Sequence, residues 1–242
     1  MSNYSVLLAG DDLGFMIKGL FSYTLFGQEV WITTSHVCTL LVMLLLVVFA
    51  LFANRAVKKA VDTEAPGAFL NVVETLIEFV DGMITSTMGK NATKFINYIS
   101  TLFLFIFISN ISGLFGLRPP TADYGVTFPL GLITFGLITF NKFKHQKVKG
   151  VVQGLCEPWV FWLPINLIGD FAVPVSLSLR LFANVLSGTI MMALYYGLLP
   201  IFVKIGIPAV LHVYFDLFSG AIQTYVFCML TMTYVSDAIG DN

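Results

Sequence analysis

Long apolar stretches separated by short polar segments dominate this chain. Five of them are long enough to cross the roughly 30 Å hydrocarbon core of a bilayer as helices. They cover residues 35–53, 95–117, 126–140, 164–199 and 205–235. The last two exceed what a bilayer requires, so we expect them to tilt, kink or bend, with Pro174 providing one break. The pattern predicts an all-α membrane protein that forms a single integral membrane domain.

The segment 67–88 has a different pattern, with an apolar face and an acidic face. Apolar residues recur there at helical spacing, namely Phe69, Val72, Val73, Leu76, Val80, Met83 and Ile84. Glu74, Glu78 and Asp81 share the other face at i, i+4 and i+7. We predict an amphipathic helix that lies on the cytoplasmic surface or packs against partner helices, with the three acids as its solvated face.

Composition agrees with a membrane protein. Hydrophobic residues make up 57% of the 242 residues and charged residues 11%, against about 25% charged in soluble domains. The net charge of −1 provides no overall field for nucleic acid, so we expect none as a partner. The three cysteines fit small buried hydrophobes, and no CxxC or HExxH pattern occurs. We therefore predict no metal and no cofactor. The first 30 residues lack the pattern of a cleavable signal peptide.

The loop charges predict the orientation of the chain. Nine basic residues fall on one side of the five-span arrangement: Arg55, Lys58, Lys59, Lys90, Lys94, Lys142, Lys144, Lys147 and Lys149. Only Lys18, Arg118 and Lys204 fall on the other side. Because basic loops stay in the cytoplasm, we expect the C-terminus inside and the N-terminal segment 1–34 outside a cell inner or plasma membrane.

Arg180 is the charge that composition alone does not explain. It lies 16 residues, about 24 Å of α-helix, from Pro164 in an almost wholly apolar stretch. A guanidinium near mid-bilayer costs about 2.5–3.5 kcal/mol on insertion scales and is too deep to reach water. Such a charge persists where a partner or a wet cavity receives it, so ion movement through a membrane is the leading hypothesis.

Polar residues accompany this arginine along one face of the fourth span. Ser176, Arg180, Asn184 and Ser187 stand at i−4, i, i+4 and i+7. The stripe suits a helix that faces a water-filled channel or a partner carrying an acid. The alternative is an internal salt bridge that only fixes helix packing, although a buried pair is an expensive way to obtain stability.

The fifth span carries a second polar stripe, in which His212, Asp216, Ser219 and Gln223 stand at i, i+4, i+7 and i+11. A row of carboxylate, imidazole, hydroxyl and amide groups can pass protons or coordinate a cation. His212 is equally well explained as an interfacial residue. Asp216 has the alternative role of neutralising Arg180. No metal-ligand pattern accompanies them.

Asp170 lies ten residues before Arg180, toward the cytoplasmic end of the fourth span. Its depth suits the mouth of an inner access path. A helix-end carboxylate that reaches the interface explains it equally well.

Several motifs in order along the chain resemble subunit a of F-type ATP synthases. The stretch from Pro164 to Gly188 is similar to the arginine-bearing helix of that family and contains SLSLRLFANVLSG. The likeness also covers FISNISGLFG, the loop PPTADYGVT and the tail FCMLTMTYVS after Gln223. It spans nearly the whole chain after about residue 35.

The resemblance implies a stator ion-channel subunit that is not catalytic alone. Arg180 would face a rotating ring of c subunits, attract each passing carboxylate, displace its H⁺ or Na⁺, and keep two offset half-channels from joining. The implied partners are the c-subunit ring, the stator stalk of subunit b, other ATP synthase subunits and membrane lipid.

Matches to family positions extend the implied site. Asn184 and Gln223 match polar positions near the arginine. Asp216 matches an ionisable position of the outer half-channel. Asp170 and Asn110 match positions that are frequently polar in the family. We group Ser176, Ser187, Ser219 and His212 with them as ion-pathway candidates. Three positions depart from the family pattern: Thr189 is an uncharged companion site, Ala183 replaces a glycine, and Val173 replaces a lysine.

Three other function classes fit the sequence less well. A secondary transporter would favour an inverted repeat with broken helices, and neither is evident. A membrane-embedded enzyme needs a nucleophile–base or metal constellation, whereas the three histidines lie far apart in sequence. A purely structural scaffold leaves the central arginine unexplained.

Overall fold

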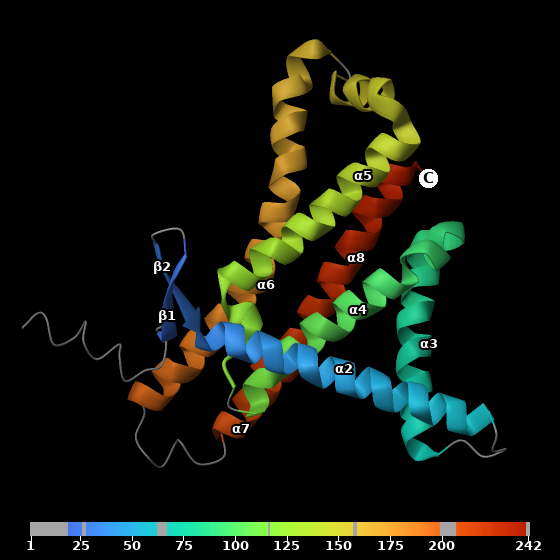
Figure 1. Cartoon of the computed structure of the whole chain (residues 1–242). Coiled ribbons are helices and arrows are strands. Elements are labelled where there is room, and N and C mark those ends of the chain that lie inside the picture. Colours follow the sequence, from blue (N-terminus) through green and yellow to red (C-terminus); the bar gives the residue numbers. More distant parts are fainter. Residues whose placement is uncertain are drawn as a thin grey trace, which may run out of the picture.

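The computed structural model describes residues 19–25, 28–61, 67–115, 117–156, 159–198 and 207–240. Helices make up almost all of this described chain, so the all-α prediction is confirmed (Figure 1). Five helical stretches are long and apolar enough to cross a membrane. They are Thr34–Lys58, Ala68–Phe115, Tyr124–Gln146, Val160–Gly197 and Val210–Ile239. Two parts of the prediction lie outside the described residues. One is most of the predicted outer segment, with Lys18. The other is the pair of predicted span ends at 199 and 205, with Lys204.

A β-hairpin precedes the first helix, which the hydrophobic pattern did not predict. Strand β1 (Gly19–Leu25) pairs antiparallel with β2 (Gln28–Thr33). The chain then enters α2 (Thr34–Val61) directly. Few residues of α2 are buried, and its apolar side chains are exposed around the helix, as expected for a helix that meets lipid on most sides.

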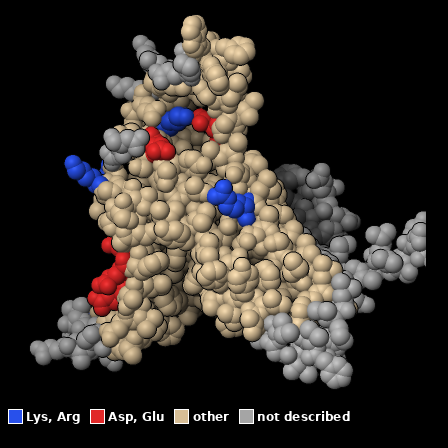
Figure 2. Space-filling model, turned by 180° about the vertical axis from the view of Figure 1, so that it is seen from behind, with Lys and Arg blue, Asp and Glu red and all other residues tan. Residues whose placement is uncertain are grey.

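The next two helices form a nearly continuous stretch that turns at a glycine. Helix α3 (Ala68–Met88) passes through η1 (Gly89–Asn91) into α4 (Ala92–Ile111), which ends in the 3₁₀ turn η2 (Ser112–Phe115). Helix α3 packs on α4 and α8, where Val80, Met83, Ile84 and Met88 join the core; Val73 is buried as well. Glu74 and Glu78 are exposed, and acidic atoms gather on the edge of the molecule where α3 lies (Figure 2). Phe69 and Val72 are largely exposed as well, and the Phe69 ring lies edge-on to the Phe49 ring of α2 with centroids 6.2 Å apart.

Two long helices form the most extensive contact between described elements. The turn η3 (Pro120–Ala122) precedes α5 (Tyr124–Cys156), and η4 (Val160–Trp162) leads into α6 (Leu163–Leu198). Helices α5 and α6 pack along one another. Helix α5 continues past residue 140, where its apolar pattern ends, because lysine and glutamine favour helix in an aqueous setting as well. Helix α6 contains Pro174 without interruption, and it changes direction along its length (Figure 1).

The last helical run contains a π-helix. It begins with α7 (Ile207–His212), passes through η5 (Val213–Ser219), whose bonding is that of a π-helix, and continues as α8 (Gly220–Ile239). π-Helical turns are rare and often mark functional sites. The predicted stripe on this span assumed uninterrupted α-helical spacing, which does not hold across η5.

The core lies where α3, α4, α6 and α8 meet. Its most deeply buried apolar side chains are Ile84, Ile99, Ile106, Leu181, Phe227 and Met232. One side of α6 joins this core through Leu177 and Leu181, which leaves the opposite side of the same helix exposed.

Candidate functional site

Arg180 lies on the exposed side of α6. Ser176 and Ser187 on the same helix are exposed too, and Asn184 is half-buried. Apolar neighbours, among them Leu179, are also exposed. The back face is largely uncharged, with isolated basic atoms in its middle (Figure 2). Among the described residues, no hydrogen bond or ion pair joins Arg180 to a carboxylate.

Asn184 connects the arginine helix to the π-helix. Its side-chain Nδ2 lies 3.0 Å from Ser219 Oγ, and Ser219 Oγ lies 3.1 Å from Asn184 Oδ1. The hydroxyl therefore accepts from the amide or donates to it. This contact fixes the end of η5 beside the exposed face of α6, one helical turn from Arg180.

Asp216 pairs with a residue of its own helical run. Its Oδ2 lies 2.7 Å from His212 Nδ1. The Asp216 side chain is 17% exposed and that of His212 is 33% exposed. The Tyr196 ring of α6 lies 6.3 Å from the imidazole. Asp216 thus bonds to His212 and not to Arg180, so the structure does not show it as the arginine's counter-ion.

Asn110 is the centre of a buried hydrogen-bond network between α4, η3 and α8. Its Nδ2 donates to the Gly220 carbonyl (3.0 Å) and to Thr224 Oγ1 (3.2 Å). Its Oδ1 accepts from Thr121 Oγ1 at 2.7 Å. The side chain is 2% exposed. With both ends of its amide bonded to protein, Asn110 holds the start of α8 against α4.

Gln223 is also buried, on α8. Its Nε2 has no hydrogen-bond acceptor within the described part of the chain. A buried unsatisfied donor is costly. This amide therefore stands apart from Asn110, whose donors are both used.

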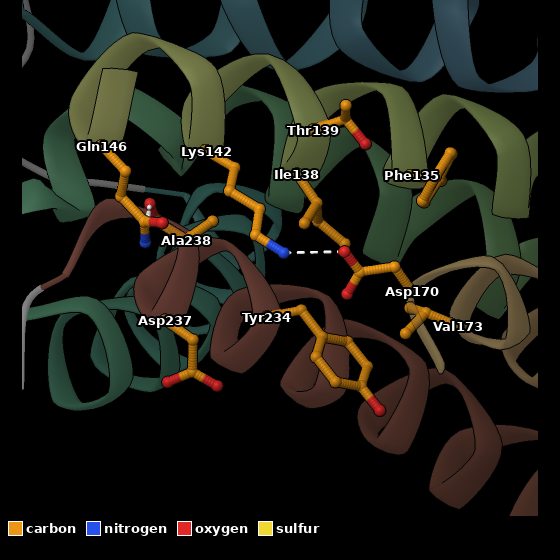
Figure 3. Close-up of a pocket in the computed structure, with 10 residues that line it drawn as sticks. All are labelled: Phe135, Ile138, Thr139, Lys142, Gln146, Asp170, Val173, Tyr234, Asp237 and Ala238. Atoms are coloured by element: carbon orange, nitrogen blue, oxygen red, sulfur yellow. Dashed lines mark hydrogen bonds and ion pairs between the residues drawn. The ribbon is translucent and has the colours of Figure 1, made fainter. Parts of the chain in front are cut away.

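Asp170 lines a cavity of about 250 Å³ between α5, α6 and α8. Lys142 Nζ lies 2.7 Å from Asp170 Oδ2, and the two side chains point toward one another across the cavity (Figure 3). Tyr234 and Asp237 line it from α8. Gln146 Nε2 donates to the Ala238 carbonyl at 3.3 Å. Asp170 is thus paired across two helices, 10 residues before the exposed arginine on the same helix.

Comparison with known proteins identifies the family. The family model for the ATP synthase A chain matches residues 36–236. The chain belongs to the ATP synthase subunit a family. It is 37% identical over 226 residues to "ATP synthase subunit a, sodium ion specific" of Propionigenium modestum, covering 87% of this chain and 75% of that protein. It is 35% identical to ATP synthase subunit a of Desulforamulus reducens (93% and 88% covered) and 33% identical to ATP synthase subunit a 2 of Chlorobaculum tepidum (86% and 63% covered).

Membership makes the chain a multi-pass component of the membrane sector of an ATP synthase. This agrees with the five described helical stretches that are long and apolar enough to cross a membrane. It also ties the chain to ATP synthesis and ion transport. Arg180, the His212–Asp216 pair and the Lys142–Asp170 pair then belong to a subunit of an energy-coupling complex.

Sequence reasoning missed several residues of this arrangement. Lys142 entered only as a loop charge, whereas it lies on α5 and pairs with Asp170. Thr121 and Thr224 were not singled out, although both bond to Asn110. Gly113 entered only as part of the motif FISNISGLFG, and it lies against Asp216. None of these has a local signal, because each contact joins segments distant in sequence.

Proposed function

We propose that this chain is the stator ion-channel subunit of the ATP synthase membrane sector. It provides two half-channels and an essential arginine that couple H⁺ or Na⁺ translocation to rotation of the c-subunit ring and to ATP synthesis. Nucleotide chemistry belongs to other subunits. The remaining partners are subunit b and membrane lipid.

The exposure of Arg180 carries this proposal. A permanent cation on an apolar membrane face is unstable against lipid. Because no described carboxylate pairs with it, an acid from outside the chain is the group that this face requires. A ring carboxylate that arrives, pairs and leaves supplies that acid without locking the rotor.

The remaining polar residues divide between two access paths. The outer path contains Asp216 and His212, with Ser219, Asn184 and Gln223 beyond them. Asn110 braces this path. Asp170 with Lys142 belongs to the inner path. Ser176 and Ser187 flank Arg180 on the ring-facing side. The excess of basic residues in cytoplasmic loops supports an outer N-terminus and an inner C-terminus.

Replacing Arg180 by lysine tests the proposal. A lysine loses its proton in a low-dielectric site far more readily than an arginine, so it no longer attracts the ring carboxylate or blocks the leak. We expect Arg180→Lys to reduce ion-driven ATP synthesis in proteoliposomes to background while the complex still assembles. Arg55→Lys, at an exposed arginine of α2, is the matched control and should keep wild-type rates.

Wild-type synthesis in the Arg180→Lys vesicles would refute the proposed role. The same preparation identifies the coupling ion, because Na⁺ added to wild-type vesicles at fixed pH stimulates transport only if Na⁺ is the ion carried. The name of the Propionigenium relative gives sodium for that protein.

A further inference from the structure

We infer that Gly113 is a positioning residue for Asp216, holding the carboxylate against His212 by carrying no side chain of its own. This inference rests on the proposed function, in which Asp216 belongs to the outer ion path. It concerns the turn η2, which lies in the motif FISNISGLFG, where the sequence assigns only Asn110 to ion movement.

The carboxylate of Asp216 lies directly against the backbone of Gly113. A Cβ built at Gly113 would stand 3.1 Å from Asp216 Cγ, 3.1 Å from Oδ2 and 3.2 Å from Oδ1. Three atoms of one group lie at this distance, so the whole carboxylate rests on the glycine. A methyl group there would force the carboxylate to move.

The surrounding contacts restrict where the carboxylate can go. At the end of η5, Ser219 is bonded to Asn184 of α6. At the next residue, the Gly220 carbonyl accepts from Asn110 of α4. Because the backbone is fixed just beyond Asp216, a displaced carboxylate must rotate about its own side-chain bonds. A movement of a few tenths of an ångström is enough to lengthen the 2.7 Å contact with His212 and weaken it.

The contact with His212 is what the glycine protects. Among the described residues, His212 is the one ionisable partner bonded to Asp216. Gly113 leaves room for the carboxylate of Asp216 beside His212. In this position, Asp216 Oδ2 bonds to Nδ1 of the His212 imidazole. The other oxygen makes no hydrogen bond to a described residue.

Gly113→Ala tests the inference in the intact complex. We expect the outer ion concentration that gives half-maximal ATP synthesis to rise roughly tenfold, the effect of losing one hydrogen bond to a charged group. The maximal rate at saturating ion should change little. Gly136→Ala is the matched control, because a Cβ at that glycine of α5 meets nothing within 4 Å.

A double-mutant cycle separates positioning from a general packing defect. If Gly113→Ala acts by breaking the contact with His212, then adding it to His212→Ala changes the half-maximal concentration no further. The inference is overturned if the double variant raises the half-maximal ion concentration by the product of the two single-variant factors. A Gly113→Ala enzyme indistinguishable from Gly136→Ala would overturn it as well.

Two further outcomes are informative. If Gly113→Ala prevents assembly, Asp216→Ala in the same chain should restore it, because the obstructing carboxylate is gone, and failure to restore it overturns the inference. The proposed function fails separately, through wild-type synthesis in Asp216→Asn and Arg180→Lys. Loss of synthesis in those two variants with no effect of Gly113→Ala would reject the positioning role alone.

Discussion

Neutralising Arg180 is the alternative role that the sequence leaves open for Asp216, yet no hydrogen bond or ion pair joins the two among the described residues. Arg180 is exposed on α6, whereas Asp216 is paired with His212. A fixed internal pair would have satisfied the arginine and left it unable to receive another acid. Keeping the two apart is what a transient external partner requires.

Asn110, which the sequence predicts for the ion path, has a bracing geometry in the structure. We expect Asn110→Asp to destabilise the subunit by about 1–3 kcal/mol, because the carboxylate keeps the shape but cannot donate to the Gly220 carbonyl. The midpoint temperature for loss of the subunit from the purified complex measures this. Asn71→Asp, at an exposed position of α3, is the control and should leave that midpoint unchanged.

At the scale of elements, the close approach of α5 and α6 sets the shape of the site. A Cβ at Gly131 would stand 2.6 Å from the Pro174 carbonyl oxygen and 3.3 Å from Ser178 Cβ. The backbone of α6 therefore touches α5 where a side chain would hold the two helices apart. The cavity with Lys142 and Asp170 lies between these same two helices and α8.

Enlarging Gly131 should separate the two helices. We expect Gly131→Val to cost more than the 1–3 kcal/mol typical of overpacking, since the obstacle is a backbone oxygen and not a flexible side chain. Reduced subunit content in purified complexes would report it. Gly136→Val in the same helix, where nothing lies within 4 Å, should assemble normally; equal losses in both variants would contradict this account.

At the scale of the whole molecule, α2 and the hairpin stand at the periphery and α4, α5, α6 and α8 form the body (Figure 1). The exposed side of α6 carries Arg180, and the cavity lined by Asp170 and Lys142 lies ten residues earlier along the same helix. The two proposed access paths begin on opposite sides of the membrane, one at Asp216 and one at Asp170. The loop charges predict which side of the membrane each faces.

Single cysteines test that sidedness. In a background with Cys38→Ser and Cys156→Ser, Thr24→Cys should react with a membrane-impermeant maleimide added outside intact cells. Lys144→Cys should react only in inverted vesicles. Both positions are exposed, and Cys228 is buried, so labelling reports sidedness. Detergent should make both variants reactive, and the opposite pattern would reverse the proposed orientation.

Much of the fold was predictable because its signals are local. Apolar runs of membrane length gave the helical class, and the spacing of Ser176, Arg180 and Ser187 gave a shared face that the regular helix α6 keeps. The stripe on the last span was less predictable. Its residues straddle η5, where π-helical bonding changes which side chains align, and the sequence carries no signal for that turn.

By itself, the sequence determined a membrane protein with a charge at mid-span that a partner or a wet cavity must receive, because burial cost and helical spacing act over a few turns. The tertiary structure alone decided which groups meet. Gly113 against Asp216, Asn110 on the Gly220 carbonyl and Lys142 on Asp170 all join segments distant in the chain. Such contacts depend on how helices pack, and no local pattern records that packing.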